Sequence, residues 1–415
     1  MISFNNVKID DVGKVVTGKT PKTSVPEYYD NDYMFIGPTD LHKHFVVNDS
    51  EKMISDKGLQ SIKGSRLQGT SILVGCIGWD MGNVAITEGE CATNQQINSI
   101  TNIKDDYNPY YIYYWLKIKK DFLFQQASVT RTPILNKTNF SNIAINIPVK
   151  SYQNSVVDIL KTIDQKIELN NKINDELEST AKLVYDYWFV QFDFPDTNGE
   201  PYKSSGGKMI YNEELKREIP DGWIVDIINN VINVKDGTHD SPKAKESGYS
   251  LITSKHLKPE GLDFDSANLI SEEDYESINK RSKVDTGDIL FSMIGSIGEI
   301  YKVDEETINF AIKNVALYKS SEKPEYMNFI YTYLKSYDMQ RYMGNVTSGS
   351  IQKFIGLGAL RNMPIFTNDD MIMMFVNTTE HLFQKKTLIK LENQELTKLR
   401  DWLLPMLMNG QVTVK

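Results

Sequence analysis

The 415-residue chain lacks the residues that mark exported, metal-binding and membrane proteins. Its two cysteines, Cys76 and Cys91, are too few for a disulfide framework, and its five histidines form no HExxH pattern. No apolar run approaches the roughly 18 residues that a bilayer span requires, and the start, MISFNNVKID, lacks the plan of a signal peptide. We therefore expect a cytoplasmic protein that binds no metal and does not enter the membrane.

The chain also lacks an excess of positive charge. Its net charge of −9 argues against a surface that attracts nucleic acid everywhere. Any DNA-binding role must rest on local basic clusters or on a basic partner. The length and the 40% share of hydrophobic residues indicate a folded protein of two or three domains.

Two long stretches, from about 151 to 187 and from about 370 to 407, carry apolar residues at every seventh position. The repeat falls on Val156, Ile163, Asn170, Leu177 and Val184 in the first stretch, and on Phe375, Leu382, Ile389, Leu396 and Leu403 in the second. This spacing is typical of helices that pack along a seam. Asn170, Asn174 and Asn393 interrupt the apolar seam, and they either fix its register or lie solvated at its edge.

A constant offset of 219 residues relates the two helical stretches, and offsets of 216 to 219 relate what precedes them. An offset of 219 residues relates Ile9, Val12, Val15 and Gly18 to Ile228, Val231, Val234 and Gly237, and an offset of 216 relates Pro148 to Pro364. The sequence therefore predicts a tandem duplication at a period far above that of solenoid repeats.

We predict an α+β fold with pseudo-two-fold duplication: two similar α/β-mixed domains joined by two long antiparallel helices that form a coiled coil. The predicted parts are a domain over 1–150, a central helix over 151–190, a linker over 191–215, a second domain over 216–369 and a distal helix over 370–415. About 34 helical residues give a rod of roughly 50 Å, with the domains expected at its opposite ends.

One motif imitates a nucleotide-binding loop. The segment from Gly13 to Thr20 matches GxxxxGK[ST], but a phosphate loop needs a helix that starts at its lysine. Pro21 and Pro26 oppose such a helix, and Val15 and Val16 favour a strand. We also find no glycine turn for AdoMet and no NPPF-like loop, so we expect no catalysis by this chain alone.

Several segments resemble those of a known family. They are GKTPKTSVPEYYDNDYMFIGPTDL, ATNQQINSI, DYWFVQFDFP, IPDGW, DGTHDSP and GSIQKFIGLGALRNMPI. Together they are similar to the specificity subunit of type I restriction-modification enzymes. The resemblance implies two target-recognition domains, each reading one half of a split double-stranded DNA sequence. It also implies that two methyltransferase subunits, which use AdoMet, and restriction subunits, which use ATP and Mg, dock on a chain that itself binds no cofactor.

Candidate DNA contacts follow from side-chain chemistry. Amides pair with adenine, arginine and lysine pair with guanine, and basic or hydroxyl groups bind phosphates. The resemblance places the loop of His239 on the DNA side. The alternative for each of these residues is an ordinary polar residue at a turn or strand end. The candidates are Lys19, Thr20, Thr39, Trp79, Asn94, Gln95, Gln96, Arg131 and Lys137 in the first domain, and His239, Lys255, Ser292, Lys313, Asn314, Ser350, Lys353 and Arg361 in the second.

Large apolar residues crowd the ends of both long helices. Tyr187, Trp188 and Phe189 follow the first helix, and Trp402, Leu403 and Leu407 end the second. Some of these residues must belong to the seam or the core, and we interpret the surplus as two quasi-equivalent docking surfaces for two copies of a catalytic subunit. The alternative is a scaffold that holds protein partners and reads no DNA. The bases that are read and the spacer between half-sites stay open, because loop geometry decides which side chain reaches the DNA.

Overall fold

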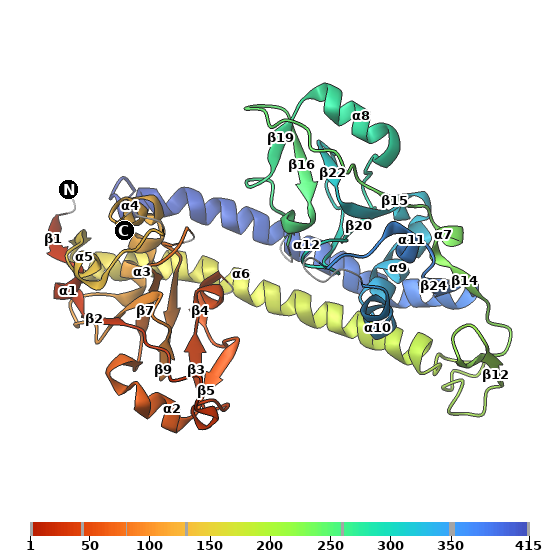
Figure 1. Cartoon of the computed structure of the whole chain (residues 1–415), viewed down its shortest axis with the longest axis horizontal. Helices are drawn as coiled ribbons and strands as arrows, with labels where there is room; N and C mark the ends of the chain where they lie inside the picture. The colour runs from red at the N-terminus through yellow and green to blue at the C-terminus, as the bar shows by residue number, and fades with distance from the viewer. Residues whose placement is uncertain are drawn as a thin grey trace. The chain divides into compact units, whose positions relative to one another are not determined.

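The computed structural model describes residues 3–42, 45–79, 81–128, 132–258, 261–347 and 353–412. It divides into two compact units (Figure 1). Unit 1 comprises Met1–Asn171 and Glu392–Lys415, and unit 2 comprises Lys172–Leu391. Each unit therefore contains one globular domain together with part of each of two long helices, α6 (Lys150–Tyr185) and α12 (Asp369–Met408).

The described residues of the first domain form three sheets. The first sheet pairs β1 (Phe4–Lys8) with β11 (Ala144–Pro148). The second sheet has the strand order β2 (Lys14–Thr17), β10 (Ile97–Thr101), β7 (Ser71–Gly75), β8 (Val84–Thr87), β4 (Val46–Val47). The third sheet has the strand order β5 (Lys52–Ile54), β3 (Tyr33–Ile36), β9 (Cys91–Thr93), β6 (Arg66–Leu67). The helices are α1 (Ile9–Val12), η1 (Pro26–Tyr28), η2 (Pro38–His42), α2 (Asp56–Ser61), η3 (Lys63–Ser65), α3 (Pro109–Lys117), α4 (Lys120–Gln125) and α5 (Lys137–Ser141).

The second domain repeats this plan. One sheet pairs β14 (Val225–Ile227) with β24 (Pro364–Phe366), and a second has the strand order β15 (Val234–Asp236), β23 (Val315–Tyr318), β20 (Ile289–Ser292), β21 (Ile300–Lys302). A third sheet has the strand order β19 (Asn268–Ile270), β16 (Tyr249–Thr253), β22 (Phe310–Lys313). Two further pairs join β12 (Met209–Asn212) to β13 (Arg217–Pro220) and β17 (Leu257–Lys258) to β18 (Gly261–Leu262). The helices are η4 (Asp186–Val190), α7 (Ile228–Val231), η5 (Ser254–His256), α8 (Glu272–Ser282), η6 (Ser320–Glu322), η7 (Pro324–Tyr326), α9 (Met327–Leu334), α10 (Tyr337–Val346) and α11 (Leu357–Arg361).

The duplication predicted from the sequence recurs in the backbone hydrogen bonds. Gly18 N donates to Ile97 O at 3.0 Å, and Gly237 N donates to Val315 O at 2.9 Å. A Cβ atom on Gly18 would lie 2.0 Å from Asn94 O, and one on Gly237 would lie 2.3 Å from Ile312 O. Both positions therefore require glycine because two backbone segments approach too closely for any side chain.

The core of each unit includes residues of the long helices. In unit 1 the fully buried strand β7 and the aromatic helix α3 pack with Val156 of α6 and Leu404 of α12. In unit 2 the ring of Phe189 lies 4.9 Å from that of Phe329 and 5.7 Å from that of Phe375, measured between centroids. Each domain is thus built onto the helices by burial of apolar and aromatic surface.

The two long helices are antiparallel within each unit. In unit 1, Tyr152 near the start of α6 donates to Leu407 O near the end of α12 at 3.1 Å, and Asp164 meets Arg400. In unit 2, Glu178 meets Lys386, and the ring of Tyr185 lies 5.9 Å from that of Phe375. Residue numbers rise along one helix as they fall along the other, which is the predicted arrangement.

Asn170 resolves one of the open alternatives for the seam. Its side chain is buried, and Nδ2 donates to Asn393 Oδ1 and to Glu392 Oε2, both at 2.8 Å. Asn393 Nδ2 in turn donates to Asn171 Oδ1 at 2.8 Å. A slip of the helices would leave a buried amide without partners, so this polar step fixes their register.

The segment predicted as a linker is folded against unit 2. Phe192 and Phe194 are buried in its core, and both oxygens of Asp193 accept 2.7 Å hydrogen bonds from Ser204 N and Oγ. The glycine- and serine-rich part forms turns, while the two phenylalanines that precede it provide the anchor. None of the helices in the described part of the chain combines the length and hydropathy that crossing a membrane requires.

Arg400→Ala should destabilise the chain by about 3–5 kcal/mol, because it removes the cation from a buried carboxylate. Asp164 is 4% exposed and accepts from Arg400 Nη1 at 2.9 Å and from Tyr114 OH at 2.7 Å. Chemical denaturation measures the free energy of unfolding. The control is Lys398→Ala on the same helix, where a 73%-exposed lysine pairs with exposed Glu395 and the loss should stay below about 0.5 kcal/mol. Equal losses in the two variants would contradict the prediction.

Candidate nucleic-acid interface

The structure brings together candidate residues that lie 75 positions apart in the sequence. In the first domain, Thr20 Oγ1 donates to Gln95 Oε1 at 2.7 Å. In the second domain, His239 Nδ1 lies 2.7 Å from Asn314 Oδ1. The offset of 219 relates Thr20 to His239 and Gln95 to Asn314, so each domain presents an equivalent pair of polar side chains at the same point of its fold.

In the first domain this pair stands where strand β2 ends beside the turn between β9 and β10. Lys19 N donates to Thr93 O at 2.9 Å, which ties the two segments together. Asn94 Nδ2 donates to Gln96 Oε1 at 3.1 Å, and Gln96 N donates to Asn94 Oδ1 at 3.0 Å. Asn94 and Gln96 thus hydrogen-bond to each other and shape the turn. Gln95, which lies between them in the sequence, is exposed, and so is Lys19 at the end of β2.

In the second domain His239 is held from two sides. Its Nε2 lies 2.9 Å from Asp236 Oδ2, and its Nδ1 meets Asn314, whose backbone adopts a positive φ of 53°. Lys313 donates to Ser241 Oγ in the loop that follows His239. The imidazole is therefore fixed in direction while its side chain stays 63% exposed.

Other candidates lie at the surface of their own domain. Trp79 is 72% exposed, and its ring centroid lies 6.0 Å from that of Phe124. Arg361 is exposed as a residue, but its Nε donates to Val234 O at 2.8 Å, so it also holds strand β15. Arg131 and Ser350 lie outside the described residues. The remaining exposed candidates are Thr39, Lys137, Lys255 and Lys353.

Ser292 is not available to DNA, so that prediction is wrong. Its side chain is fully buried in β20; Oγ donates to Ser296 O and accepts from Glu299 N at 2.8 Å. A hydroxyl that closes the turn after a buried strand has no hydrogen-bonding capacity directed outward. The sequence pattern of a serine after a strand does not distinguish the two cases.

The predicted docking surfaces also need correction. Trp188, Phe189 and Leu407 are buried in the cores of their units, with exposures of 6%, 0% and 1%. They seal the junction of helix and domain because each domain needs apolar cover where the helix meets it. Tyr187 and Trp402 are exposed, and Leu403 is partly buried.

The segment that imitates a nucleotide-binding loop does not form one. Lys14–Thr17 is strand β2, and the next helical segment in the described chain, η1, begins only at Pro26 and has three residues. No helix N-terminus lies where phosphate would need it. Among the described residues there is also no group of three or more side chains suited to hold a metal ion.

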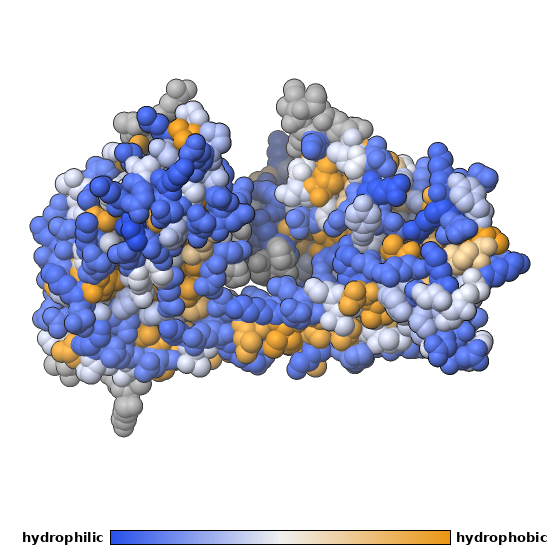
Figure 2. Space-filling view, turned by 90° about the horizontal axis from the view of Figure 1, so that it is seen from below, coloured by the Kyte–Doolittle hydropathy of each residue, from blue (hydrophilic) through white to orange (hydrophobic). Residues whose placement is uncertain are grey.

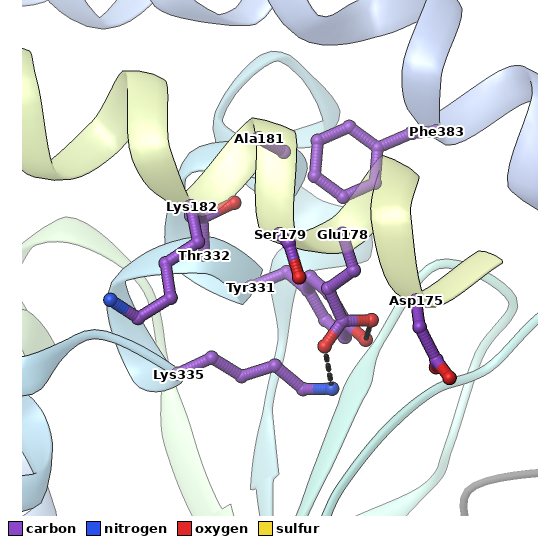
Figure 3. Close-up of a pocket in the computed structure, with 9 residues that line it drawn as sticks. All are labelled: Asp175, Glu178, Ser179, Ala181, Lys182, Tyr331, Thr332, Lys335 and Phe383. Atoms are coloured by element: carbon purple, nitrogen blue, oxygen red, sulfur yellow. Dashed lines mark hydrogen bonds and ion pairs between the residues drawn. The ribbon is translucent and has the colours of Figure 1, made fainter. Parts of the chain in front are cut away.

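A cavity of about 190 Å³ lies in unit 2 beside Glu178, Tyr331 and Lys335 (Figure 3). Glu178 accepts from Lys335 and Lys386, and Tyr331 OH donates to it at 3.1 Å. Burial opposes ionisation of this carboxyl, but the two lysines outweigh it and lower its pKa to about 2. The cavity is smaller than usual ligand sites and its charges are already paired, so we interpret it as a structural junction.

Sequence reasoning missed Asp236 and Arg281, which complete the surroundings of His239. Asp236 Oδ1 accepts from Arg281 Nη2 at 2.8 Å. The role of Asp236 could have been predicted, since this residue precedes His239 by three positions in the segment DGTHDSP. Arg281 lies 45 residues further on in α8, and nothing in the local sequence connects it with that loop.

A duplicated fold that presents matched but chemically different polar pairs defines a two-domain recognition protein. Residues 1–179 match the family described as the type I restriction modification DNA specificity domain. The chain is 27% identical to the type I restriction enzyme MjaIX specificity subunit of Methanocaldococcus jannaschii, over 98% of this chain and 93% of that protein. It is 23% identical to the HindI specificity subunit of Haemophilus influenzae, over 68% of this chain and 71% of that protein.

The fold agrees with these similarities. A crystal structure of the type I restriction-modification S subunit from M. genitalium superposes with a TM-score of 0.50 at 16% identity, covering 98% of this chain and 96% of that one. The chain is thus similar to type I restriction-modification specificity subunits along nearly its whole length. The fold expected from the sequence, two similar mixed domains with long antiparallel helices, is confirmed.

Glu178→Gln should lower the free energy of unfolding near pH 7 by roughly 2–3 kcal/mol, a figure reduced for the partial exposure of the site. Because the folded pKa of Glu178 lies below its ordinary value of 4.5, the stabilisation is complete above about pH 4.5 and is lost as pH falls towards 2. The difference between wild type and variant should therefore shrink across that window in denaturation measured by circular dichroism. Glu176→Gln, an exposed change on the same helix, is the control; a difference independent of pH would contradict the assignment.

Proposed function

We propose that this chain is the DNA-reading subunit of a type I restriction-modification complex, with one half-site of a split target read by each domain. The observation that carries the proposal is the pair of equivalent positions, Thr20 with Gln95 and His239 with Asn314. The framework is the same in both domains while the exposed chemistry differs. Because the two domains expose different side chains, we predict an asymmetric target.

The side chains suit these roles. The carboxamide of Gln95 both donates and accepts, which fits the N6 and N7 atoms of adenine. The exposed lysines Lys19, Lys137, Lys255 and Lys353 suit phosphates, which position a protein without reading sequence. Because the whole chain carries a net charge of −9, we expect it to bind DNA weakly alone and well beside a basic partner.

We further propose that the chain performs no chemistry itself. In this proposal adenine methylation belongs to methyltransferase subunits that bind AdoMet, and cleavage belongs to restriction subunits that use ATP and Mg. The absence of a phosphate-binding loop among the described residues supports the division of labour. The complex would act on DNA in the cytoplasm.

Exposed apolar residues on the long helices favour two methyltransferase copies. They include Leu169 of α6 and Trp402 of α12 in unit 1, and Leu388 of α12 and Leu183 of α6 in unit 2. The offset of 219 relates Leu169 to Leu388 and Leu183 to Trp402, so both units expose equivalent positions, from 53% to 67% accessible. Figure 2 shows hydrophobic side chains gathered over the long helices on a largely hydrophilic face. Such residues mark protein-binding sites.

The proposal is tested by selecting bound duplexes from a random library with this chain co-purified with its methyltransferase subunit. We expect two short half-sites separated by a fixed gap, with different sequences in the two halves. A stable protein complex that retains no motif would contradict the proposal and favour the alternative function, a scaffold for protein partners.

Trp402→Ala should reduce the number of bound methyltransferase copies from two to one, because a buried tryptophan anchor typically contributes about 2 kcal/mol or more. Native mass spectrometry at a protein concentration near the dissociation constant measures the ratio. Tyr211→Ala is the control, since Tyr211 is 58% exposed and lies on strand β12 rather than on a long helix. Two copies retained by the Trp402 variant would exclude this residue from the docking surface.

A further inference from the structure

Arg281 is held by one nitrogen while most of its side chain faces solvent. It lies in the last turn of α8, which packs against β15 and β22 (Figure 1). Its Nη2 donates to Asp236 Oδ1 at 2.8 Å, to Gly237 O at 2.9 Å and to Asp236 O at 3.3 Å. The side chain of Asp236 is 12% exposed and that of Arg281 is 59% exposed. Nε and Nη1 make no hydrogen bond within the described residues.

Asp236 connects this arginine to the candidate base-reading pair of the second domain. One carboxylate oxygen accepts from Arg281, and the other lies 2.9 Å from Nε2 of His239. His239 in turn meets Asn314. The mostly buried carboxylate therefore fixes the guanidinium and the imidazole relative to each other, and both present their remaining surface on the exposed side of the loop.

In the first domain, a single hydrogen bond from a serine supports the end of the strand that corresponds to β15. There the carbonyl of Thr17, which is 219 residues before Asp236, accepts a 3.0 Å hydrogen bond from Ser65 Oγ at the end of η3. A hydroxyl suffices to support the end of strand β2. The second domain uses a guanidinium at the equivalent place, with further donors directed outward, and support of the strand does not account for them.

We propose that Arg281 is a specificity-determining residue that donates, through a nitrogen other than Nη2, to O6 or N7 of a guanine in the half-site read by the second domain. These two acceptors on the major-groove edge of guanine are the ones that arginine contacts most often. The Asp236 carboxylate holds the guanidinium in place before DNA binds, which reduces the entropy lost on contact. This inference rests on the proposed function.

The test uses the complex of the full chain with its methyltransferase subunit and compares selected duplexes for wild type, Arg281→Ala, Arg281→Lys and Lys280→Ala. Lys280 is exposed on the same helix, so its removal changes charge equally. We expect both Arg281 variants to lose roughly tenfold or more of the preference for guanine at one position of one half-site. The other half-site should stay unchanged, and Lys280→Ala should select the wild-type motif.

Two results would overturn the inference. A uniform loss of affinity with the motif intact in Arg281→Ala would make this residue a phosphate contact. Loss of every preference in that half-site by both variants would make Arg281 a support of the loop only. Failure of the proposed function itself looks different, because the wild-type complex would then select no split motif.

Discussion

A carboxylate on α6 that meets a cation on α12 and a tyrosine of the adjoining domain is the constraint on which each unit depends. In unit 1 the three groups are Asp164, Arg400 and Tyr114. In unit 2 they are Glu178, Lys386 and Tyr331, joined by Lys335. A largely desolvated charge is stable only when all of its partners are present. Apolar packing supplies most of the stabilisation, but these junctions set the register of the helices and the placement of each domain on them.

This arrangement separates what is shared from what varies. Both domains share the glycine contacts at Gly18 and Gly237, and the strand order β2-β10-β7-β8 of the first domain recurs as β15-β23-β20-β21 in the second. The side chains at the ends of β2 and β15 differ, since Thr20 and Gln95 of the first domain correspond to His239 and Asn314 of the second. A framework fixed by backbone contacts tolerates such changes because the loop side chains contribute little to the core. A recognition protein can thus change its target without rebuilding its fold.

Periodicity was a reliable guide to the framework and a poor one to individual side chains. The heptad spacing and the repeat offset predicted both long helices and the duplication, since burial of a helix face demands regular spacing. A different argument, the crowding of large apolar residues at the helix ends, placed Trp188, Phe189 and Leu407 on docking surfaces, whereas they are buried. An apolar residue at a helix end fits a core and a docking site equally well until the neighbouring domain is placed. Ser292 failed for the same reason, because its burial depends on strands distant in sequence.

The sequence by itself determined the tandem duplication, the two long helices, the strand character of the segment that imitates a nucleotide-binding loop, and the family to which the chain is similar. These features follow from local spacing and from comparison of one half with the other. Only the tertiary structure decided that Thr20 meets Gln95, that His239 meets Asn314, and that Asp236 joins His239 to Arg281. Those contacts link residues up to 75 positions apart, and strand pairing and helix packing, rather than any local pattern, bring them within hydrogen-bonding distance.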